Sequence, residues 1–280
     1  MRVVHRASEA SGLAGGVVVP TMGALHEGHA SLVRRARQIA EERGLPGVVV
    51  TVFVNPTQFN EQADFERYPR TLEADAEVCR AAGADLVFAP DVGEVYPPGR
   101  DVPVPPLPAV ATEPGLEDAH RPGHFAGVCQ VVKRLLELTK PSAAVFGEKD
   151  WQQLQVVRAM VAQEGMGVEI IGEPTVREAD GLAMSSRNRF LRPEERGAAR
   201  ALSRTLHAAG ACATVEEAEE AMRRELAAAG VAQGVEYAVV RDAETLLAWR
   251  PGRPGRALIA ARVGTVRLID NDAWPAPERA

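Results

Sequence analysis

Two histidines three residues apart, His26 and His29, are the first side chains in the chain whose types and spacing could do chemistry. They lie in the stretch PTMGALHEGHASLVRRA, between an apolar run and a segment with helical periodicity. Zinc-binding histidines on a helix are spaced four apart, and a tetrahedral site needs further ligands that no obvious cysteine or histidine cluster supplies here. Two other interpretations are a tight turn with incidental histidines and a site that holds phosphate groups.

The position of this stretch favours the phosphate interpretation. In an open parallel sheet, ligands bind beyond the carboxyl ends of the strands, and the free N–H groups of a helix N-terminus attract anions. Gly23 and Gly28 would let the backbone approach a phosphate closely. The histidines add hydrogen-bond donors that can be neutral or charged near pH 7. Taken alone, the stretch still allows the incidental turn.

A second stretch, FGEKDWQQLQ, follows the apolar run AAVF and opens another helical pattern. Gly147 permits a tight turn, and Lys149 brings a compact ammonium to the predicted strand end. Lys149 is one of only three lysines among 32 basic residues, which argues against an ordinary solvated charge run at a helix start. Gln152 and Gln153 are neutral donor–acceptors suited to a polar substrate.

A third stretch, READGLAMSSRNRFL, carries a dense row of donors without helical patterning, from Ser185 to Asn188. Arg187 and the two serine hydroxyls could clamp a polyphosphate, although an ordinary surface loop would look similar. The chain has neither a Walker P-loop nor a GxGxxG fingerprint, so the usual ATPase and NAD interpretations lose their main support.

The elements that must position these residues alternate between apolar runs and helical patterns. Repeated βα units of this kind predict a right-handed, doubly wound parallel sheet, an α/β fold of the Rossmann-like type. The run GVVVTVFVN is apolar without alternation, as in a central strand covered on both faces. Strands are predicted over 15–20, 47–55, 84–90, 143–146 and 167–172, and helices around 32–40, 72–79, 127–139 and from about 151.

The pattern changes after about Pro174. Two alanine- and glutamate-rich helical patterns run over 193–229, and strand-like runs follow over 235–242 and 256–271, the last compatible with a hairpin. We therefore expect a first domain over 1–175 and a smaller α+β domain over 176–280. The proline-rich stretch 96–108 is predicted to be an exposed loop.

Composition narrows the class of protein. A net charge of -6 gives no electrostatic reason to expect nucleic-acid binding, and no apolar run approaches the roughly 18 residues of a membrane span. The N-terminus lacks the apolar core of a secretory signal. Cys79, Cys129 and Cys212 are far apart and are interpreted as buried thiols of a reducing, cytoplasmic compartment.

The order of the motifs suggests a family. A histidine motif after the first strand and a later serine-and-basic loop is the layout of the HIGH-motif nucleotidyltransferase group, an analogy of fold alone. Six stretches in order closely resemble the pantothenate synthetase (pantoate–β-alanine ligase) family: PTMGALHEGHASL, FVNPTQF, RPGHFAGV, FGEKDWQQL, PTVREADGLAMSSRN and RLIDN. The resemblance implies an ATP-dependent ligase that forms pantoyl adenylate with release of pyrophosphate, and then joins it to β-alanine with release of AMP.

The resemblance also implies roles for individual residues. His29 matches the position called the proton donor, and His26, Lys149 and Arg187 are expected to act with it in catalysis. Gln58 matches a residue that contacts pantoate and β-alanine, and Gln153 matches a pantoate ligand. Trp151 stands where a tyrosine is often found, an exchange expected to alter packing and not chemistry. The implied ATP site comprises Met22, Gly23, Ala24, Leu25, His26, Glu27, Gly28, His29, Gly147, Glu148, Lys149, Asp150, Val176, Met184, Ser185, Ser186 and Arg187.

Partners and alternatives follow from the same resemblance. We expect ATP as co-substrate, Mg²⁺ arriving with the ATP and not at a private metal site, a homodimer, and a second domain that closes over the ATP site. One alternative is a related nucleotidyltransferase that joins ATP or CTP to a phosphorylated acceptor, whose pocket should carry more basic residues than Gln58 and Gln153 offer. A non-catalytic nucleotide- or RNA-binding module is a further alternative, opposed by the joint presence of His29, Lys149 and Arg187.

Overall fold

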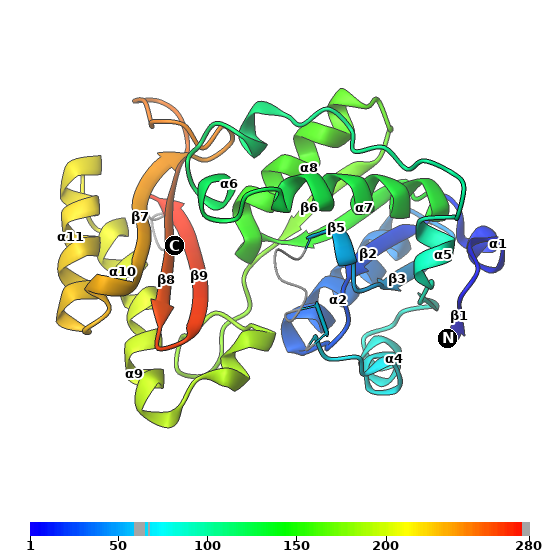
Figure 1. Ribbon diagram of the computed structural model, residues 1–280, viewed down its shortest axis with the longest axis horizontal. Helices are drawn as coiled ribbons and strands as arrows, with labels where there is room; N and C mark the ends of the chain where they lie inside the picture. The colour runs from blue at the N-terminus through cyan, green and yellow to red at the C-terminus, as the bar shows by residue number, and fades with distance from the viewer. Residues whose placement is uncertain (59–64, 67, 276–280) are drawn as a thin grey trace. The chain divides into compact units, whose positions relative to one another are not determined.

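The computed structural model describes residues 1–58, 65–66 and 68–275 (Figure 1). They divide into two compact units, each with a sheet of its own. The first unit comprises Met1–Thr112, Glu117–Glu148 and Gln153–Pro174. The second comprises the chain from Thr175 onward together with two short segments, Glu113–Leu116 and Lys149–Gln152.

The sheet of the first unit has six strands in the order β1-β4-β3-β2-β5-β6, and every neighbouring pair is parallel. The predicted doubly wound parallel sheet is therefore confirmed. The first strand was not predicted, because three residues are too few to show a period. The strands are β1 (Arg2–Val4), β2 (Val17–Thr21), β3 (Val48–Val52), β4 (Leu86–Phe88), β5 (Ala143–Gly147) and β6 (Glu169–Glu173).

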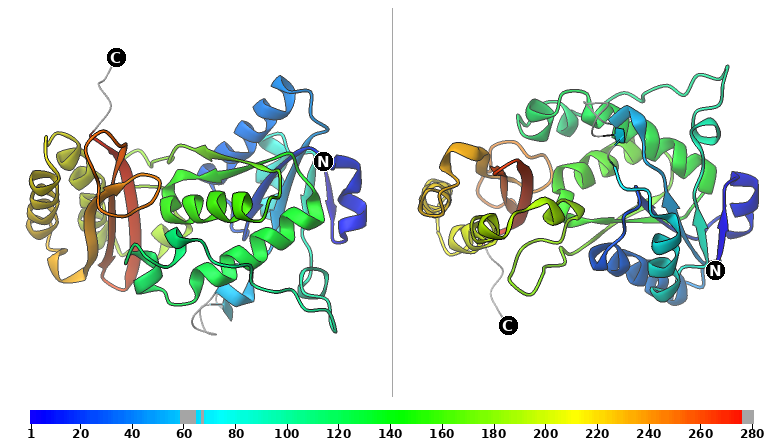
Figure 2. Two further views of the ribbon diagram at one scale, coloured as in Figure 1. Left: turned by 90° about the horizontal axis from the view of Figure 1, so that it is seen from above. Right: turned by 60° about the horizontal axis from the view of Figure 1, so that its bottom comes forward.

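Helices cover both faces of this sheet, with α2 and α4 on one face and α7 and α8 on the other (Figures 1 and 2). The valine runs of β2 and β3 are buried because both faces are covered. The α2 helix contributes Val33, Ala36 and Ile39 to the core on its face. The helices are α1 (Ala7–Ala10), α2 (Glu27–Glu42), α4 (Leu72–Ala81), α5 (Val92–Val95), α6 (Glu117–His120), α7 (His124–Thr139) and α8 (Trp151–Gln163).

The second unit contains an antiparallel sheet in the order β7-β8-β9, which confirms the predicted smaller α+β part with its hairpin. Helices α10 and α11 pack on one face of the sheet, where Leu202, Met222 and Leu226 meet Ile259 and Leu268. The elements are α9 (Arg196–Ala199), α10 (Ala201–Gly210), α11 (Val215–Ala228), β7 (Val235–Asp242), β8 (Gly255–Val263) and β9 (Val266–Trp274).

Two smaller expectations can be compared with the structure. The stretch 96–108 contains no helix or strand, as predicted. Cys79 and Cys129 are buried, and burial raises the pKa of both thiols to about 12. The expectation of burial is wrong for Cys212, which is only half-buried after the end of α10.

Candidate active site

The carboxyl ends of neighbouring strands bring three predicted site segments to one edge of the parallel sheet. Strand β2 pairs with both β3 and β5, so the residues that follow these strands meet at this edge. The His26 motif follows β2, a 3₁₀ turn over Pro56–Gln58 follows β3, and Glu148 follows β5. The amide Nε2 of Gln58 lies 2.6 Å from the sulfur of Met22, which joins the first two segments directly.

A buried carboxylate holds the turn between β2 and α2. Asp75 of α4 is 2% exposed, and its two oxygens accept the backbone N–H groups of Ala24 at 3.1 Å and Leu25 at 2.8 Å. Gly23 has a φ of +82°, and an added Cβ there would lie 2.9 Å from Asp75 Oδ2, so this position requires glycine. The N–H groups of Ala24 and Leu25 therefore serve Asp75, which differs from the expectation that the backbone of this turn is free to bind an anion.

The two histidines also bond to the backbone. His26 caps α2, and its Nδ1 accepts the N–H of Gly28 at 3.1 Å. His29 Nδ1 accepts the N–H of His26 at 3.3 Å, and the ring centroids lie 4.1 Å apart. A backbone N–H can only donate, so each Nδ1 carries a lone pair, and each neutral ring carries its proton on Nε2. Two Nε2–H donors suit a phosphate oxygen, whereas zinc would need a lone pair from each ring.

Gln58 lies on a supported turn. Asn55 is 1% exposed, and its amide donates to Gln58 Oε1 at 3.3 Å and to the carbonyl oxygen of Gly127 at 3.1 Å. The Tyr96 hydroxyl donates to Asn55 Oδ1 at 2.8 Å, and burial raises the pKa of Tyr96. A Cβ added to Gly127 would lie 2.6 Å from the carbonyl oxygen of Thr57, so the glycine lets α7 approach the turn closely.

The RPGHFAGV motif also supports Gln58 through His124, which is 5% exposed. His124 Nδ1 donates to the carbonyl oxygen of Gln58 at 3.4 Å, and Arg121 donates to His124 Nε2 at 3.0 Å. The two contacts agree on one neutral tautomer, because a carbonyl only accepts and a guanidinium only donates.

In the second unit, the predicted serine loop is built on a short antiparallel bridge. The N–H of Met184 donates to the carbonyl oxygen of Val176 at 2.9 Å, which brings these two predicted site residues together. Ser185 caps the 3₁₀ turn over Ser186–Phe190 by accepting the N–H of Arg187 at 3.3 Å. Arg187 is exposed at the first turn of this 3₁₀ segment.

Two further side chains hold this loop from within the second unit. Asn188 is 8% exposed and donates to Glu178 Oε1 at 2.6 Å and to the carbonyl oxygen of Ala183 at 3.0 Å. Arg177, next to Val176, forms a two-point ion pair with Asp270 of β9 at 2.7 and 3.1 Å.

Asp270 is almost fully buried, so the state of this ion pair depends on opposing effects. Burial raises the pKa of Asp270, and the hydrogen bonds and charge of Arg177 oppose that rise. Burial is the largest single influence on Arg177 and lowers its pKa, but the hydrogen bonds to Asp270 together with the charges of Asp270 and Asp272 outweigh it, so the pKa is raised. We treat the pair as charged, because the two-point geometry satisfies both groups.

The predicted site residues thus occupy two sets. The first unit contains Met22 to His29, Gln58, Gly147, Glu148 and Gln153, and the second contains Lys149, Asp150, Val176 and Met184 to Arg187. Sequence reasoning missed the residues that support these sets: Asp75, Asn55, Tyr96, His124, Arg177 and Asp270. A signal existed for Asp75, which is an acidic residue on the predicted apolar helix face of Leu72, Ala76 and Cys79.

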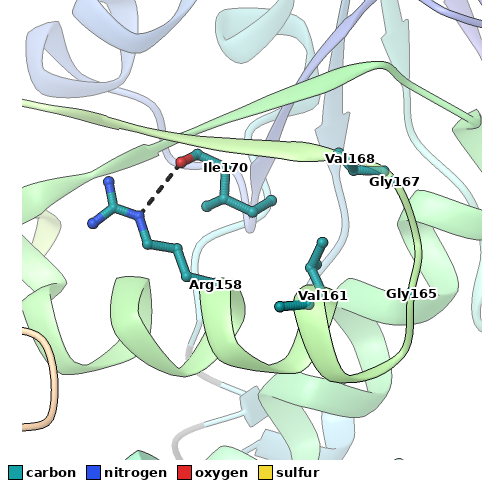
Figure 3. Close-up of a pocket in the computed structure, with 7 residues that line it drawn as sticks. Arg158, Val161, Gly165, Gly167, Val168 and Ile170 are labelled. Atoms are coloured by element: carbon teal, nitrogen blue, oxygen red, sulfur yellow. Dashed lines mark hydrogen bonds between the residues drawn. The ribbon is translucent and has the colours of Figure 1, made fainter.

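A separate pocket lies at the other end of the parallel sheet (Figure 3). It is lined by the last turns of α8 and the start of β6, including Arg158, Val161 and Ile170. Arg158 Nε donates to the carbonyl oxygen of Ile170 at 3.4 Å. The pocket is at the amino end of β6 and contains none of the predicted site residues, so it is not part of the candidate site.

Comparison with known proteins finds relatives along the whole chain. The family model for pantoate–β-alanine ligase matches residues 2–273. A pantothenate synthetase of Nocardioides sp. is 53% identical over 269 residues, which cover 91% of this chain and 77% of the relative. The crystal structure of the pantothenate synthetase from Thermus thermophilus superposes with a TM-score of 0.88 at 45% identity, covering 99% of this chain and 100% of the other.

A second solved structure carries ligands. The pantoate–β-alanine ligase of Francisella tularensis, in complex with β-γ ATP and β-alanine, superposes with a TM-score of 0.77 at 30% identity. The match covers 98% of this chain and 97% of the other.

Proposed function

This chain belongs to the pantoate–β-alanine ligase family, and from that premise we propose that it condenses pantoate with β-alanine in an ATP-dependent reaction that passes through pantoyl adenylate. The observation that carries the proposal is the edge of the parallel sheet where the turn that leads into His26 and His29 contacts Gln58 through Met22. Donors for phosphate and a neutral amide for a hydroxy acid are the groups that this chemistry needs.

In the first step, a carboxylate oxygen of pantoate attacks the α-phosphorus of ATP, and the bond from that phosphorus to the bridging oxygen of the β-phosphate breaks. Negative charge builds on the α-phosphate and on the departing pyrophosphate. His26, His29, Lys149 and Arg187 supply fixed donors and cations for that charge, which lowers the barrier. Gln58 and Gln153 hold pantoate through uncharged hydrogen bonds.

In the second step, the amine of β-alanine attacks the carbonyl carbon of the adenylate. The bond from that carbon to the phosphate oxygen breaks, AMP departs, and the nitrogen loses a proton as the amide forms. His29 matches the family position called the proton donor, and in the neutral ring its Nε2–H would act as a hydrogen-bond donor to a phosphate oxygen. The adenylate is prone to hydrolysis, so closure of the second domain over the ATP site would exclude water.

Magnesium is the expected companion of ATP, and it would neutralise charge on the β- and γ-phosphates. Among the residues that the structure describes, no group of three or more histidine, cysteine, aspartate or glutamate side chains is arranged to hold a metal ion. Chelation should abolish activity, and added Mg²⁺ should restore it without zinc.

The proposal extends to assembly and location. We expect a homodimer, and a chain that works in the cytoplasm without contact with nucleic acid. None of the described helices combines the length and the apolar character that a bilayer crossing requires.

The test is release of pyrophosphate from ATP in the absence of β-alanine, at single-turnover level, with a panel of hydroxy acids. Pantoate should support the burst, and β-alanine should then release AMP in equal amount. Pyrophosphate that appears only after the amine is added would exclude the two-step scheme. Transfer of a nucleotide to a phosphorylated acceptor, with no amine requirement, would support the nucleotidyltransferase alternative instead.

A further inference from the structure

The sheet of the second unit holds the main chain around Lys149 at two points. Asn271 of β9 donates from Nδ2 to the carbonyl oxygen of Lys149 at 2.8 Å. The indole Nε1 of Trp151 donates to the carbonyl oxygen of Ala243 at 2.7 Å, and the guanidinium of Arg256 lies 3.7 Å from the centre of the indole ring. The segment is therefore fixed on both sides of Asp150.

Asn271 can adopt only one orientation in this contact. Its side chain is 3% exposed, and Arg256 Nε donates to its Oδ1 at 2.7 Å. A guanidinium has no acceptor, so the amide oxygen must face Arg256, and a carbonyl has no donor, so the amide NH₂ must face Lys149. Arg256 thus orients Asn271, and Asn271 holds Lys149.

The strand register explains how β9 serves this segment. Asn271 pairs with Leu258 of β8, and Arg256 lies two residues from Leu258, so Asn271 and Arg256 share one face of the sheet. The preceding residue, Asp270, belongs to the opposite face, where it pairs with Arg177. Two successive residues of the RLIDN motif therefore reach two different predicted ATP-binding segments.

We propose that Asn271 is a positioning residue that sets where the Lys149 ammonium can reach, with Arg256 and Trp151 holding Asn271 and the segment in register. The proposal rests on the proposed function, which assigns the ammonium of Lys149 to the phosphates of ATP. A lysine side chain is a flexible four-carbon stem, so its charged group is useful only if its backbone is fixed. Asn271 acts through Lys149 and is not itself a catalytic residue.

The test variant is Asn271→Asp, which keeps the size of the side chain and an acceptor for Arg256 but has no N–H for the Lys149 carbonyl. Asp272→Asn is the matched control, because Asp272 is the next residue of β9, is exposed, and undergoes the reverse exchange. Two rates are measured: pantoate-dependent pyrophosphate release without β-alanine, and amide formation from supplied pantoyl adenylate and β-alanine.

We expect Asn271→Asp to slow the first half-reaction by roughly ten- to a hundredfold, the range for a displaced catalytic group. The second half-reaction should be nearly unchanged, because pyrophosphate has already departed. In a Lys149→Ala background, Asn271→Asp should have little further effect, since a residue that acts through another is not additive with it. The control variant should match the wild type in both rates.

Three results would overturn the proposal: a normal first half-reaction in Asn271→Asp, equal losses in both half-reactions, or the same fold loss with and without Lys149. If Asn271→Asp does not fold, Asn271→Ala decides by the same criteria, because it also removes the N–H donor of the Lys149 carbonyl and places no charge in the buried site. A wild-type protein without pantoate-dependent pyrophosphate release would instead refute the proposed function, so the two failures are distinguishable.

Discussion

Replacing Asp75 with asparagine removes the charge behind the His26 motif without changing the size of the side chain. The carboxylate accepts three hydrogen bonds, from the N–H groups of Ala24 and Leu25 and, at 3.2 Å, from the hydroxyl of Thr71. An asparagine has one acceptor oxygen, so in either orientation its NH₂ group must face a backbone N–H. At least one buried donor then loses its partner.

The size of the effect follows from these contacts. A hydrogen bond to a charged group contributes about 1.5–3 kcal/mol, and the remaining oxygen of asparagine retains a weaker, neutral bond. We expect Asp75→Asn to lower the free energy of unfolding by about 2–3 kcal/mol, since one charge-assisted bond is lost and one is weakened. A shift of the turn by about 1 Å would slow adenylate formation by roughly a hundredfold.

Urea unfolding and single-turnover pyrophosphate release measure the two effects on the same preparation. Glu73→Gln is the control, because Glu73 is an exposed acid in the same first turn of α4. This exchange removes one negative charge from the start of the helix without touching the turn after β2. An ordinary surface change alters the free energy of unfolding by up to about 0.5 kcal/mol. If Asp75→Asn differs from the control by no more than that and releases pyrophosphate at the normal rate, the turn does not depend on Asp75.

Three more results are expected. Lys149→Arg should slow adenylate formation nearly as much as Lys149→Ala, roughly a hundred- to a thousandfold, because a planar guanidinium does not replace a compact ammonium; near-normal single-turnover rates would make Lys149 a solvated charge. Arg196 donates to Asp180 at 2.8 Å and lowers the pKa of that carboxyl, so Arg196→Gln should lower the stability at neutral pH. The difference in unfolding midpoint between wild type and variant should shrink as pH falls below about 4, where Asp180 becomes protonated. A difference that is constant with pH would exclude a stabilising ion pair. Thiol titration with DTNB at pH 8 should label Cys212 before Cys79 and Cys129, because burial raises the pKa of the latter two thiols to about 12. Equal labelling of all three thiols in the native protein would contradict the burial of Cys79 and Cys129.

Local patterns were enough to predict most of the fold. The unbroken valine runs of β2 and β3 and the helical spacing of apolar residues around Ile39 can be recognised from neighbouring residues alone. β1 was missed because its three residues carry no period, and because a strand this short is defined by its partner β4, more than 80 residues away.

The site was predictable only where a residue type is informative by itself. His26, His29 and Lys149 drew attention as donors beside glycines, but the residues that hold them did not. Asp75 reaches its partners 50 and 51 residues back along the chain, and Asn271 reaches Lys149 across 122 residues. Only the tertiary fold creates such contacts, and no spacing rule encodes them.

The same limit explains why the backbone N–H groups of the turn after β2 differ from expectation. A helix start after a strand predicts free backbone N–H groups for an anion. Here Asp75 and the ring of His26 accept those of Ala24, Leu25 and Gly28. These three N–H groups therefore already have acceptors within the protein.

Oxygen transfer from pantoate tests the central claim most directly. Pantoate labelled with ¹⁸O in its carboxylate is incubated with ATP, Mg²⁺, β-alanine and the enzyme, and the AMP and pyrophosphate are analysed by mass spectrometry. If the carboxylate attacks the α-phosphorus, one ¹⁸O atom appears in each AMP and none in pyrophosphate. AMP without label, formed at the same rate as the amide, would contradict the pantoyl adenylate and the roles assigned here to His29, Lys149 and Asn271.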